Sequence, residues 1–407
     1  MIETHSIEIV KSTAPVLQKN SEAIGKRFYQ LLFESHPELY NIFNQTNQKR
    51  GVQQRALAHS VYICGEHMDH LDAIKPIILR ICHKHRAIGI VPEHYPIVGK
   101  HLIQAVKDVL GNQVTEEIIQ AWEKAYQYIA DIFIEIEQEL YDQARAQEGG
   151  WEGFREFVVV KKVKESDVIN SFYLKPADGK AIAQFQPGQY LTLKAKIPGE
   201  KYTHIRHYSL SDAPGKDYYR ISVKREDARN GNPAGIVSNY LHRNIQEGGI
   251  LEFSSPAGDF ILNTKSMNPV VLISGGVGLT PMISMLNTII EKQPGRKVTY
   301  IHAAINGRHH AMKEHVARLA SQNSNIRSYV CYESPTEEDR RTESFDKEGF
   351  IDQAWLESIL DNTQGEFYLC GPIPFMQVIY RALRQMDIPK ERIHYEAFGP
   401  MSTLGED

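Results

Sequence analysis

The feature of the sequence that most constrains the fold is a change of pattern at the glycine-rich string GGWEG, residues 149–153. Before this string, residues 1–147 place apolar side chains at the 3.6-residue spacing of amphipathic helices. After it, alternating apolar and polar segments such as residues 157–163, 190–193 and 219–223 are typical of β-strands. An all-α module therefore gives way to a β module at this joint.

A second change of pattern begins near residue 268. From there, apolar segments at residues 270–274, 298–303 and 367–370 alternate with helical stretches, which is the signature of a parallel sheet. A chain of 407 residues is also too long for a single hydrophobic core. We therefore predict a multidomain protein with an α/β third module.

The three domains are expected at residues 1–147, 151–262 and 268–407. Residues 333–348 are rich in charge and almost devoid of apolar side chains, so we expect an exposed loop inside the third domain.

The composition excludes several classes of protein. Hydrophobic residues make up 42% and charged residues 24% of the chain, as in folded globular domains. A net charge of −4 provides no positive field for nucleic acid or an anionic membrane. The chain has neither an apolar run of about 18 residues nor the pattern of a signal peptide, so we expect a cytoplasmic location. The cysteines form no CxxC pair, which favours reduced thiols at Cys64, Cys82, Cys331 and Cys370.

The string GGVGLTP, residues 275–281, follows an apolar strand and precedes a helical pattern. Glycines let a backbone approach a pyrophosphate, and a helix N-terminus favours its negative charge. Thr280 can cap this helix, and Pro281 suits its first turn. A tight turn that binds no ligand is the alternative.

The string CGP, residues 370–372, repeats this arrangement at the end of another strand. Ligands of open α/β sheets bind at the carboxyl ends of the strands, so the two strings together predict a dinucleotide site. Cys370 is then expected near a nicotinamide, and a buried structural thiol is the alternative. The predicted residues are Gly275, Gly276, Val277, Gly278, Leu279, Thr280, Pro281, Cys370, Gly371 and Pro372.

In the β module, the string RHYS at residues 206–209 places Arg206 and Tyr208 on the same face of a strand. An arginine suits a phosphate, a tyrosine ring packs on a flat heterocycle, and Ser209 can hydrogen-bond a ring nitrogen. Alone, the string is an ordinary β-strand. Downstream, the string GIVSN at residues 235–239 opens a helical segment whose free N–H groups suit a second phosphate contact.

The strings PGQY, RHYS, GIVSN, GGVGLTP and CGP occur in the order found in the ferredoxin reductase-like flavoenzymes, which this part of the chain resembles. The resemblance implies an antiparallel β-barrel that binds FAD, followed by a nicotinamide dinucleotide domain. In that family a C-terminal aromatic residue covers the flavin, and Phe398 matches it. The FAD-binding residues implied are Tyr190, Arg206, His207, Tyr208, Ser209, Gly235, Val237, Ser238, Glu396, Ala397, Phe398, Gly399 and Pro400.

A flavin divides a hydride into single-electron steps, so a flavin reductase needs an electron acceptor. Nine of the 17 histidines precede residue 150, and a histidine-rich helical domain suggests haem as that acceptor. His85 continues an apolar stripe that includes Ile78 and Ile81. His83 falls off that face. A satisfied core histidine is the alternative to a metal ligand.

Glu137 lies on an apolar stripe of the last long helix of this module, and a carboxylate there needs a partner. If Glu137 meets the second nitrogen of a metal-bound His85, directly or with Tyr95, it pushes electron density toward the metal. A buried structural hydrogen bond is the alternative. Glu135 belongs to the polar face of that helix and is expected in solvent.

Polar groups also border apolar faces on the opposite side of the expected haem. Gln53 heads a stripe continued by Leu57, and Tyr29 lies beside another apolar face. Tyr29 and Gln53 suit hydrogen bonding to a diatomic ligand, whereas Leu57 and Phe43 suit walls that limit its room.

The whole chain, including the GGWEG joint, the string KH at residues 84–85 and the string EHYPIVGKHL, resembles the flavohaemoglobins. The resemblance implies a globin fold with His85 as the proximal iron ligand. It further implies Tyr29, Gln53 and Leu57 as the residues on the distal side of the haem. On the proximal side it implies a hydrogen-bond relay of Tyr95 and Glu137. Two further haem-pocket residues are implied, Phe43 and Lys84.

The same resemblance implies a nitric oxide dioxygenase that oxidises nitric oxide with O2 to nitrate, using NAD(P)H electrons passed through FAD to haem b. Its partners would be small-molecule substrates, with no nucleic acid, membrane span or protein partner required. An NAD(P)H-dependent oxygen or ferric reductase is one alternative, and an oxygen-storing or gas-sensing globin is another. NADH is the expected donor, with measurable use of NADPH. Arg308 lies where an arginine can pair with the 2′-phosphate of NADPH, but position alone does not fix where its guanidinium points, so a solvated loop arginine is the favoured interpretation.

Overall fold

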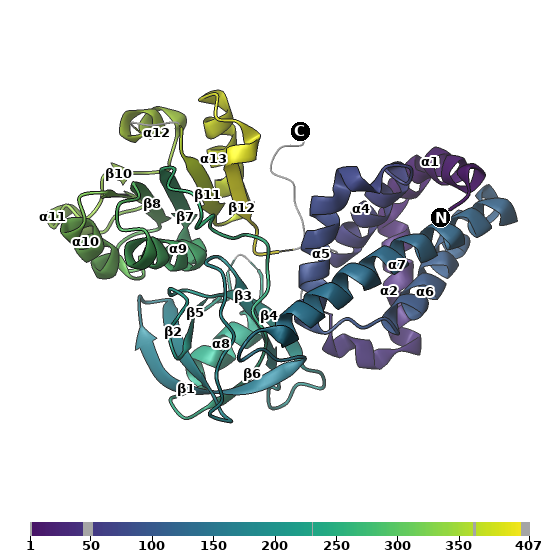
Figure 1. Ribbon diagram of the computed structural model, residues 1–407, viewed down its shortest axis with the longest axis horizontal. Helices are drawn as coiled ribbons and strands as arrows, with labels where there is room; N and C mark the ends of the chain where they lie inside the picture. Colours follow the sequence, from purple (N-terminus) through teal and green to yellow (C-terminus); the bar gives the residue numbers. More distant parts are fainter. Residues whose placement is uncertain (1, 44–51, 230, 361–363, 400–407) are drawn as a thin grey trace. The chain divides into compact units, whose positions relative to one another are not determined.

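The computed structural model describes residues 2–43, 52–229, 231–360 and 364–399 (Figure 1). The chain forms two compact units. The first comprises Met1–Arg155, Thr192–Arg206 and Phe253–Asp259, and the second comprises Glu156–Leu191, His207–Glu252 and Phe260–Asp407.

The first unit is built mainly on helices, as the 3.6-residue spacing predicts. They are α1 (Thr4–Lys19), α2 (Ser21–Ser35), η1 (Pro37–Asn41), α4 (Val52–Glu66), η2 (Leu71–Ile74), α5 (Lys75–Ile88), α6 (His94–Leu110), η3 (Gly111–Gln113) and α7 (Glu116–Ala146), where η marks a 3-10 helix. The N-terminus of α7 is capped by Thr115, whose hydroxyl accepts a hydrogen bond from the N–H of Ile118 at 3.3 Å. Buried apolar faces of α1, α2, α6 and α7 form the main core of these helices. A second cluster, which includes Ile78, Cys82 and Phe133, lies between α5 and α7.

An antiparallel six-stranded sheet follows, with the strand order β4-β3-β6-β1-β2-β5. Its strands are β1 (Phe154–Lys164), β2 (Ile169–Pro176), β3 (Tyr190–Ala195), β4 (His204–Ser209), β5 (Tyr219–Lys224) and β6 (Ile250–Ser254). Leu210, directly after β4, forms an antiparallel bridge with Ile221 of β5. Because β4 and β5 are the outer strands in this order, the bridge joins the two edges of the sheet. One helix, α8 (Ile236–Arg243), lies between β5 and β6 in the chain.

The last part of the chain forms a parallel sheet with the strand order β10-β9-β8-β7-β11-β12. Its strands are β7 (Val270–Gly275), β8 (Val298–Ala304), β9 (Ile326–Tyr332), β10 (Lys347–Glu348), β11 (Glu366–Cys370) and β12 (Ile393–Glu396). Its helices are η4 (Gly276–Gly278), α9 (Leu279–Lys292), α10 (Lys313–Gln322), α11 (Glu337–Arg341), α12 (Gln353–Ile359), α13 (Ile373–Gln385) and η5 (Lys390–Arg392).

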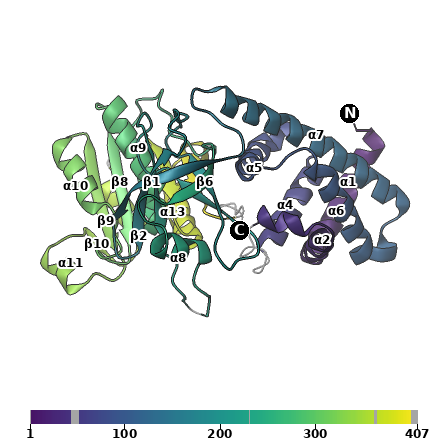
Figure 2. The same ribbon diagram turned by 90° about the horizontal axis from the view of Figure 1, so that it is seen from below.

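Helices cover both faces of this parallel sheet (Figures 1 and 2). Val270 and Leu272 of β7 share a core with α9 and α10, whereas Val271 and Ile273 share a core with α12 and α13. Burial on both faces explains why the sequence of β7 is continuously apolar instead of alternating.

The charge-rich residues 333–348 are not simply an exposed loop, so this prediction was wrong in part. They contain α11 and the edge strand β10. The helix begins with a capping box in which Thr336 and Asp339 exchange hydrogen bonds. Asp339 is buried, and it accepts a hydrogen bond from the N–H of Gly307 at 3.1 Å. Capping and a backbone contact order this segment, and an apolar pattern cannot reveal either.

None of the helices in the described part combines the length and apolar character needed to cross a membrane. All four cysteines are free thiols, and all are buried.

Candidate functional site

Three polar side chains from three helices meet beside the apolar face of α5. Oε1 of Glu137, from α7, lies 2.7 Å from Nδ1 of His85 on α5. The same oxygen accepts a 2.7 Å hydrogen bond from the hydroxyl of Tyr95 on α6. The Tyr95 hydroxyl also lies 3.3 Å from Nδ1 of His85. The structure therefore brings together the three residues that the sequence placed on the proximal side.

Burial explains why this network matters energetically. The Glu137 side chain is only 4% exposed, and a buried carboxylate is costly unless hydrogen bonds compensate for lost water. Burial and the neighbouring Glu137 carboxylate raise the pKa of Tyr95, so its hydroxyl keeps its proton and remains a donor. Glu135 is exposed, as its place on the polar face predicts.

The arrangement leaves one nitrogen of His85 for a metal. Glu137 engages Nδ1, and Nε2 has no hydrogen-bond partner among the residues that the structure describes. The imidazole packs 6.0 Å from the ring of Phe133, measured between centroids. These residues fit a haem iron held by one imidazole whose second nitrogen is fixed by a carboxylate. Lys84, the neighbouring predicted residue on α5, is half-buried.

His83 does not join this network, although it lies only one half-turn away on α5. Burial lowers the pKa of His83, which favours its neutral form. Its Nδ1 is buried without a hydrogen-bond partner in the described part of the chain. The sequence prediction that separated His83 from the His85 stripe therefore agrees with the geometry.

The predicted distal residues lie on α2, α4 and the segment after η1. Tyr29 is 5% exposed, and its ring centroid lies 4.8 Å from Phe28, 5.7 Å from Phe33 and 5.6 Å from Phe43. Leu57 packs against the same core cluster. Gln53 is half-buried one turn before Leu57 on α4.

Helices α2 and α4 approach closely near these residues. A Cβ added at Gly25 of α2 would lie 3.0 Å from Cβ of Gln54 on α4. The small side chain of Gly25 thus lets the turn of α4 that carries Gln53 pack on the helix that carries Tyr29. This contact gives a local reason why the two predicted hydrogen-bond donors belong to adjacent helices.

On β4, burial alternates as the sequence predicts. Arg206 and Tyr208 are half-buried, His207 between them is exposed, and Ser209 is buried. The ring of His207 lies 4.8 Å from that of Tyr190 on β3. This strand offers a guanidinium and a phenol ring on one face, which fits the phosphate and the flat ring of FAD.

Helix α8 begins directly after Gly235, and Val237 is buried in its first turn. The hydroxyl of Ser238 accepts a hydrogen bond from the N–H of Glu226 at 3.2 Å. The side chain of Asn239 donates to the carbonyl oxygen of Glu226 at 2.8 Å. Both side chains are thus hydrogen-bonded to the backbone of the preceding loop at Glu226. The group on α8 that suits a phosphate is therefore the set of backbone N–H groups in its first turn.

The two predicted dinucleotide turns lie side by side at the ends of β7 and β11. These strands are parallel neighbours, with Ser274 opposite Cys370. A Cβ added at Gly278 would lie 2.2 Å from the carbonyl oxygen of Cys370, so the approach requires glycine. Gly276 has a φ of 56°, and a Cβ there would meet nothing within 4 Å. The turn therefore faces open space, which fits a pyrophosphate.

Thr280 does not cap α9, which corrects one sequence prediction. The helix begins at Leu279 with Gly278 at the capping position, and the Thr280 hydroxyl donates to the carbonyl oxygen of Val277 at 3.0 Å. The 3-10 segment η4 leads directly into α9, which begins at Leu279. Thr280 is therefore already inside the helix and cannot occupy the capping position before it. Pro281 lies in the first turn, as predicted.

The CGP string ends β11 and begins α13. Cys370 is fully buried, and burial raises the pKa of its thiol, which therefore stays protonated. A Cβ at Gly371 would lie 3.1 Å from the backbone nitrogen of Gly275, so the two turns touch. Pro372 precedes the first residue of α13.

The C-terminal string follows β12, whose last residue, Glu396, is paired with Cys370 of β11. The N–H of Gly399 donates to the carbonyl oxygen of Ala397 at 2.8 Å. The side chain of Phe398 is 51% exposed, so its ring has surface available to cover a flat ligand. Pro400, the last predicted residue of this string, lies outside the described residues.

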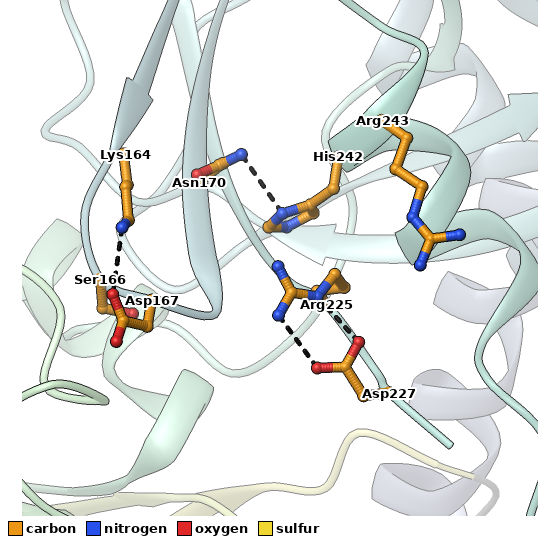
Figure 3. A pocket seen from close by; sticks show the side chains of 8 residues that line it. All are labelled: Lys164, Ser166, Asp167, Asn170, Arg225, Asp227, His242 and Arg243. Atoms are coloured by element: carbon orange, nitrogen blue, oxygen red, sulfur yellow. Dashed lines mark hydrogen bonds and ion pairs between the residues drawn. The ribbon is translucent and has the colours of Figure 1, made fainter.

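A polar cavity of about 370 Å³ in the second unit was not predicted (Figure 3). It is lined by Lys164, Ser166, Asp167, Asn170, Arg225, Asp227, His242 and Arg243. Lys164 pairs with Asp167 at 3.0 Å and Arg225 pairs with Asp227 at 2.8 Å, so much of its charge is neutralised internally. Nε of Arg308 lies 3.1 Å from Oδ2 of Asp167, so the arginine that was considered for a 2′-phosphate contact is paired with a carboxylate.

Arg86 is a second feature that sequence reasoning missed. Its guanidinium is buried and donates hydrogen bonds to Oγ of Ser255 and the carbonyl oxygen of Pro256, both at 2.5 Å. Nearby on α5, Nε of Arg80 lies 3.3 Å from Oδ2 of Asp259. The helix that carries His85 is thus tied at two places to the segment Phe253–Asp259 of the same compact unit. Ser255 is 169 residues away from Arg86 in the sequence, so no local sequence pattern predicts this contact.

Known families match all three parts of the chain. A globin family matches residues 26–133, an oxidoreductase FAD-binding domain matches residues 156–261, and an oxidoreductase NAD-binding domain matches residues 272–381. The prediction of an all-α globin domain, an antiparallel FAD domain and a parallel-sheet NAD domain is confirmed. The expected cofactors, haem, FAD and a nicotinamide dinucleotide, agree with these domains.

Relatives and solved structures cover the whole chain. The flavohemoprotein of Bacillus cereus is 56% identical over 404 residues, which are 99% of this chain and 100% of that protein. A flavohemoglobin crystal structure from Malassezia yamatoensis, with bound FAD and haem, has a TM-score of 0.85 at 26% identity and covers 98% of this chain and 100% of that one. The FAD/NAD-binding domain of a nitric oxide dioxygenase from Vibrio cholerae is 42% identical, with a TM-score of 0.55, over 60% of this chain and 99% of that one.

Proposed function

Because this chain belongs to the flavohaemoglobin (flavohemoprotein) family of globin–reductase oxidoreductases, we propose that it is a nitric oxide dioxygenase. The reaction oxidises nitric oxide with O2 to nitrate. When bound, the dinucleotide supplies a hydride, FAD passes its electrons on singly, and haem iron provides the site where O2 and nitric oxide react. The name of the Vibrio cholerae relative supports this activity.

The observation that carries the proposal is the His85–Glu137–Tyr95 network inside a globin fused to a reductase. A carboxylate 2.7 Å from Nδ1 makes the imidazole a stronger electron donor. Strong donation to iron suits reaction of O2 better than its reversible storage. The same chain supplies the domains for FAD and NAD(P)H, so it needs no protein partner as an electron source.

Each group of residues then has a defined task. His85 holds the iron through Nε2, and Glu137 holds the proton at Nδ1 with support from Tyr95. Tyr29 and Gln53 donate hydrogen bonds on the distal side, where Leu57 and Phe43 limit the space. Arg206, Tyr208 and the first turn of α8 bind FAD, while the turns at residues 275–281 and 370–372 bind the dinucleotide.

The proposal also covers the organisation and location of the protein. The domain limits are residues 1–147, 151–262 and 268–407, and the protein acts in the cytoplasm on small-molecule substrates. NADH is the preferred electron donor, and NADPH is also used.

Two measurements test the function. The visible spectrum of the purified protein should show haem and flavin together. Rapid mixing of its oxygenated form with nitric oxide should then yield one nitrate for each nitric oxide, and NADH should sustain turnover. Slow nitrate formation without turnover would instead indicate oxygen storage or sensing. NADH oxidation that does not respond to nitric oxide would indicate an oxygen or ferric reductase.

A further inference from the structure

Asp212 links the strand that carries the predicted FAD residues to the helix that follows the dinucleotide turn. It lies just beyond Ser209, the last residue of β4. Its backbone carbonyl accepts a 2.7 Å hydrogen bond from the hydroxyl of Ser284, and its Oδ1 accepts a 2.8 Å hydrogen bond from the side-chain amide of Asn287. Both donors belong to α9, whose N-terminus adjoins the glycine turn.

These donors belong to a polar stripe on one face of α9. Ser284, Asn287 and Glu291 are spaced by three and four residues, so they share a face of the helix. Glu291 pairs with Lys216 at 2.6 Å, which places the segment from Asp212 to Lys216 along that stripe. Every residue of α9 from Leu279 to Ile289 is buried, so Ser284 and Asn287 make their hydrogen bonds to Asp212 from buried positions.

Asp212 is equally well fixed on the side of the antiparallel sheet. Its Oδ2 accepts a 2.9 Å hydrogen bond from the Tyr218 hydroxyl and lies 3.6 Å from Nη1 of Arg220. Arg220 also donates from Nε to the hydroxyl of Ser211 at 3.2 Å. Burial alone would raise the pKa of Asp212, but Arg220 and the hydrogen bonds from Asn287 and its other donors hold that pKa below its usual value. The group is therefore a carboxylate.

The orientation of the Asn287 amide is also determined. Its Nδ2 faces the Asp212 carboxylate, and its Oδ1 lies 2.8 Å from Nε2 of His315 on α10. A carboxylate accepts but cannot donate, so the amide nitrogen must point toward Asp212. The connection consequently runs from β5 through Asp212 to α9 and on to α10, with each polar atom paired.

We propose that Asp212 is a positioning residue for hydride transfer, because it fixes α9 and its glycine turn relative to β4. The inference rests on the proposed function, in which β4 binds the flavin and the turn binds the dinucleotide. In that step the nicotinamide is oxidised as its hydride leaves, and the flavin is reduced as it gains the hydride. Reaction rates of this kind fall by about 100-fold for a misplacement of about 1 Å.

The test compares full-length, cofactor-loaded Asp212→Ala, Asp212→Asn and Asn287→Ala with the parent. Flavin reduction by saturating NADH is followed by anaerobic stopped flow, with protonated and deuterated NADH. We expect the limiting rate to fall about 10- to 100-fold in Asp212→Ala and Asn287→Ala, with a changed isotope effect and a Kd for NADH within about twofold of the parent. Asp212→Asn keeps an oxygen that can accept from Asn287, so its loss should be smaller.

A second readout does not depend on activity. Hydrogen exchange of the peptide that spans α9 should accelerate in Asp212→Ala and in Asn287→Ala. The matched control is Asp217→Asn, since Asp217 lies in the same segment between β4 and β5 but is exposed, and its side chain forms an ion pair with Lys175 at 2.6 Å. This control should change neither the hydride-transfer rate nor exchange in α9.

Asp212→Asn and Asn287→Ala carry the test if Asp212→Ala does not fold. The proposal is overturned if these variants lose thermal stability but keep the parent limiting rate and isotope effect, because Asp212 would then only hold the fold together. Flavin reduction is measured without nitric oxide or O2. A parent protein that forms no nitrate would therefore overturn the proposed function while leaving this result readable.

Discussion

Oε1 of Glu137 lies 2.7 Å from Nδ1 of His85, and it is also the atom that accepts the Tyr95 hydroxyl. One buried oxygen thus fixes the ring orientation of a histidine on α5 and closes a contact with α6. Because Nδ1 is engaged, only Nε2 can serve a metal. The pair joins residues that are 52 positions apart, so the electronic properties of the site depend on the packing of α5 against α7.

Replacement of Glu137 by Gln should weaken electron donation by His85. An amide carries no negative charge, so the imidazole loses basicity while the shape of the site is kept. We expect a lower iron–histidine stretching frequency in the resonance Raman spectrum of the ferrous protein, and a loss of about 10- to 100-fold in nitric oxide turnover. Glu135→Gln, an exposed change on the same helix, is the control. An unchanged frequency in Glu137→Gln would contradict the proximal role.

His85 and His83 can be separated by replacing each with Ala. Only His85 has one ring nitrogen held by Glu137 and the other available. His85→Ala should therefore abolish normal haem incorporation or the five-coordinate ferrous spectrum, and His83→Ala should retain both. The opposite outcome would show that the ligand is His83 and that the assigned helical register is wrong.

Tyr29→Phe should release bound oxygen faster. The substitution removes the hydroxyl but keeps the ring contacts with Phe28, Phe33 and Phe43. A hydrogen bond to a partly anionic oxygen contributes about 1.5 to 3 kcal/mol, which corresponds to a roughly 10- to 150-fold faster dissociation. Tyr40→Phe is a suitable control, because Tyr40 stacks on Phe33 with centroids 3.9 Å apart. An unchanged dissociation rate would exclude Tyr29 from the oxygen site.

The sequence predicts most of the fold because periodicity reports burial directly. The helical module, several of the strands and the two glycine turns follow from patterns within a few residues, whereas the adjacency of the two turns comes from the pairing of β7 with β11. Glu137 and His85 were predicted as site residues for a related reason: each is a polar residue on an apolar stripe, and a polar side chain in that position needs a partner. The identity of that partner followed only from the resemblance and from two stripes considered together.

The residues that were missed have no such local signal. Arg86 and Asp212 look like ordinary polar residues, and their importance comes from partners in distant segments. The prediction that Thr280 caps α9 failed for a different reason. The 3-10 turn η4 continues directly into α9, so the helix begins one residue before Thr280. Burial of Asp339 within a charge-rich segment likewise depends on a tertiary contact with Gly307. Contacts between segments that are distant in the sequence therefore cannot be predicted from the residue pattern of one segment alone.

Cofactor preference should depend little on Arg308. Its guanidinium is already paired with Asp167 and is 74% exposed, so water and a carboxylate compete with any phosphate. We expect the parent protein to prefer NADH with measurable NADPH use, and Arg308→Ala to change kcat/KM for NADH by less than about twofold. The measurement is kcat/KM for both donors in both proteins. If the parent prefers NADPH and the variant loses only that activity, Arg308 is a specificity residue and the prediction is wrong.

His302 should make the stability of the protein fall in mild acid. This residue is fully buried on β8, where its Nδ1 lies 2.8 Å from the hydroxyl of Ser274 and its ring lies 4.5 Å from that of His310. Burial lowers the pKa of His302 from 6.5 to about 3. The unfolded chain therefore binds a proton below about pH 6.5 that the folded protein takes up only near pH 3.

The contribution of the neutral imidazole is thus complete above about pH 6.5 and is lost progressively as the pH falls toward 3, at about 1.4 kcal/mol per pH unit. Urea titrations between about pH 7.5 and 5 would give the free energy of unfolding. His302→Gln can still accept from Ser274 but cannot titrate, so its stability should decline less steeply than that of the parent. His5→Gln, at a side chain that is 70% exposed, should keep the parent slope. Equal slopes for the parent and His302→Gln would mean that His302 titrates alike in the folded and unfolded chains.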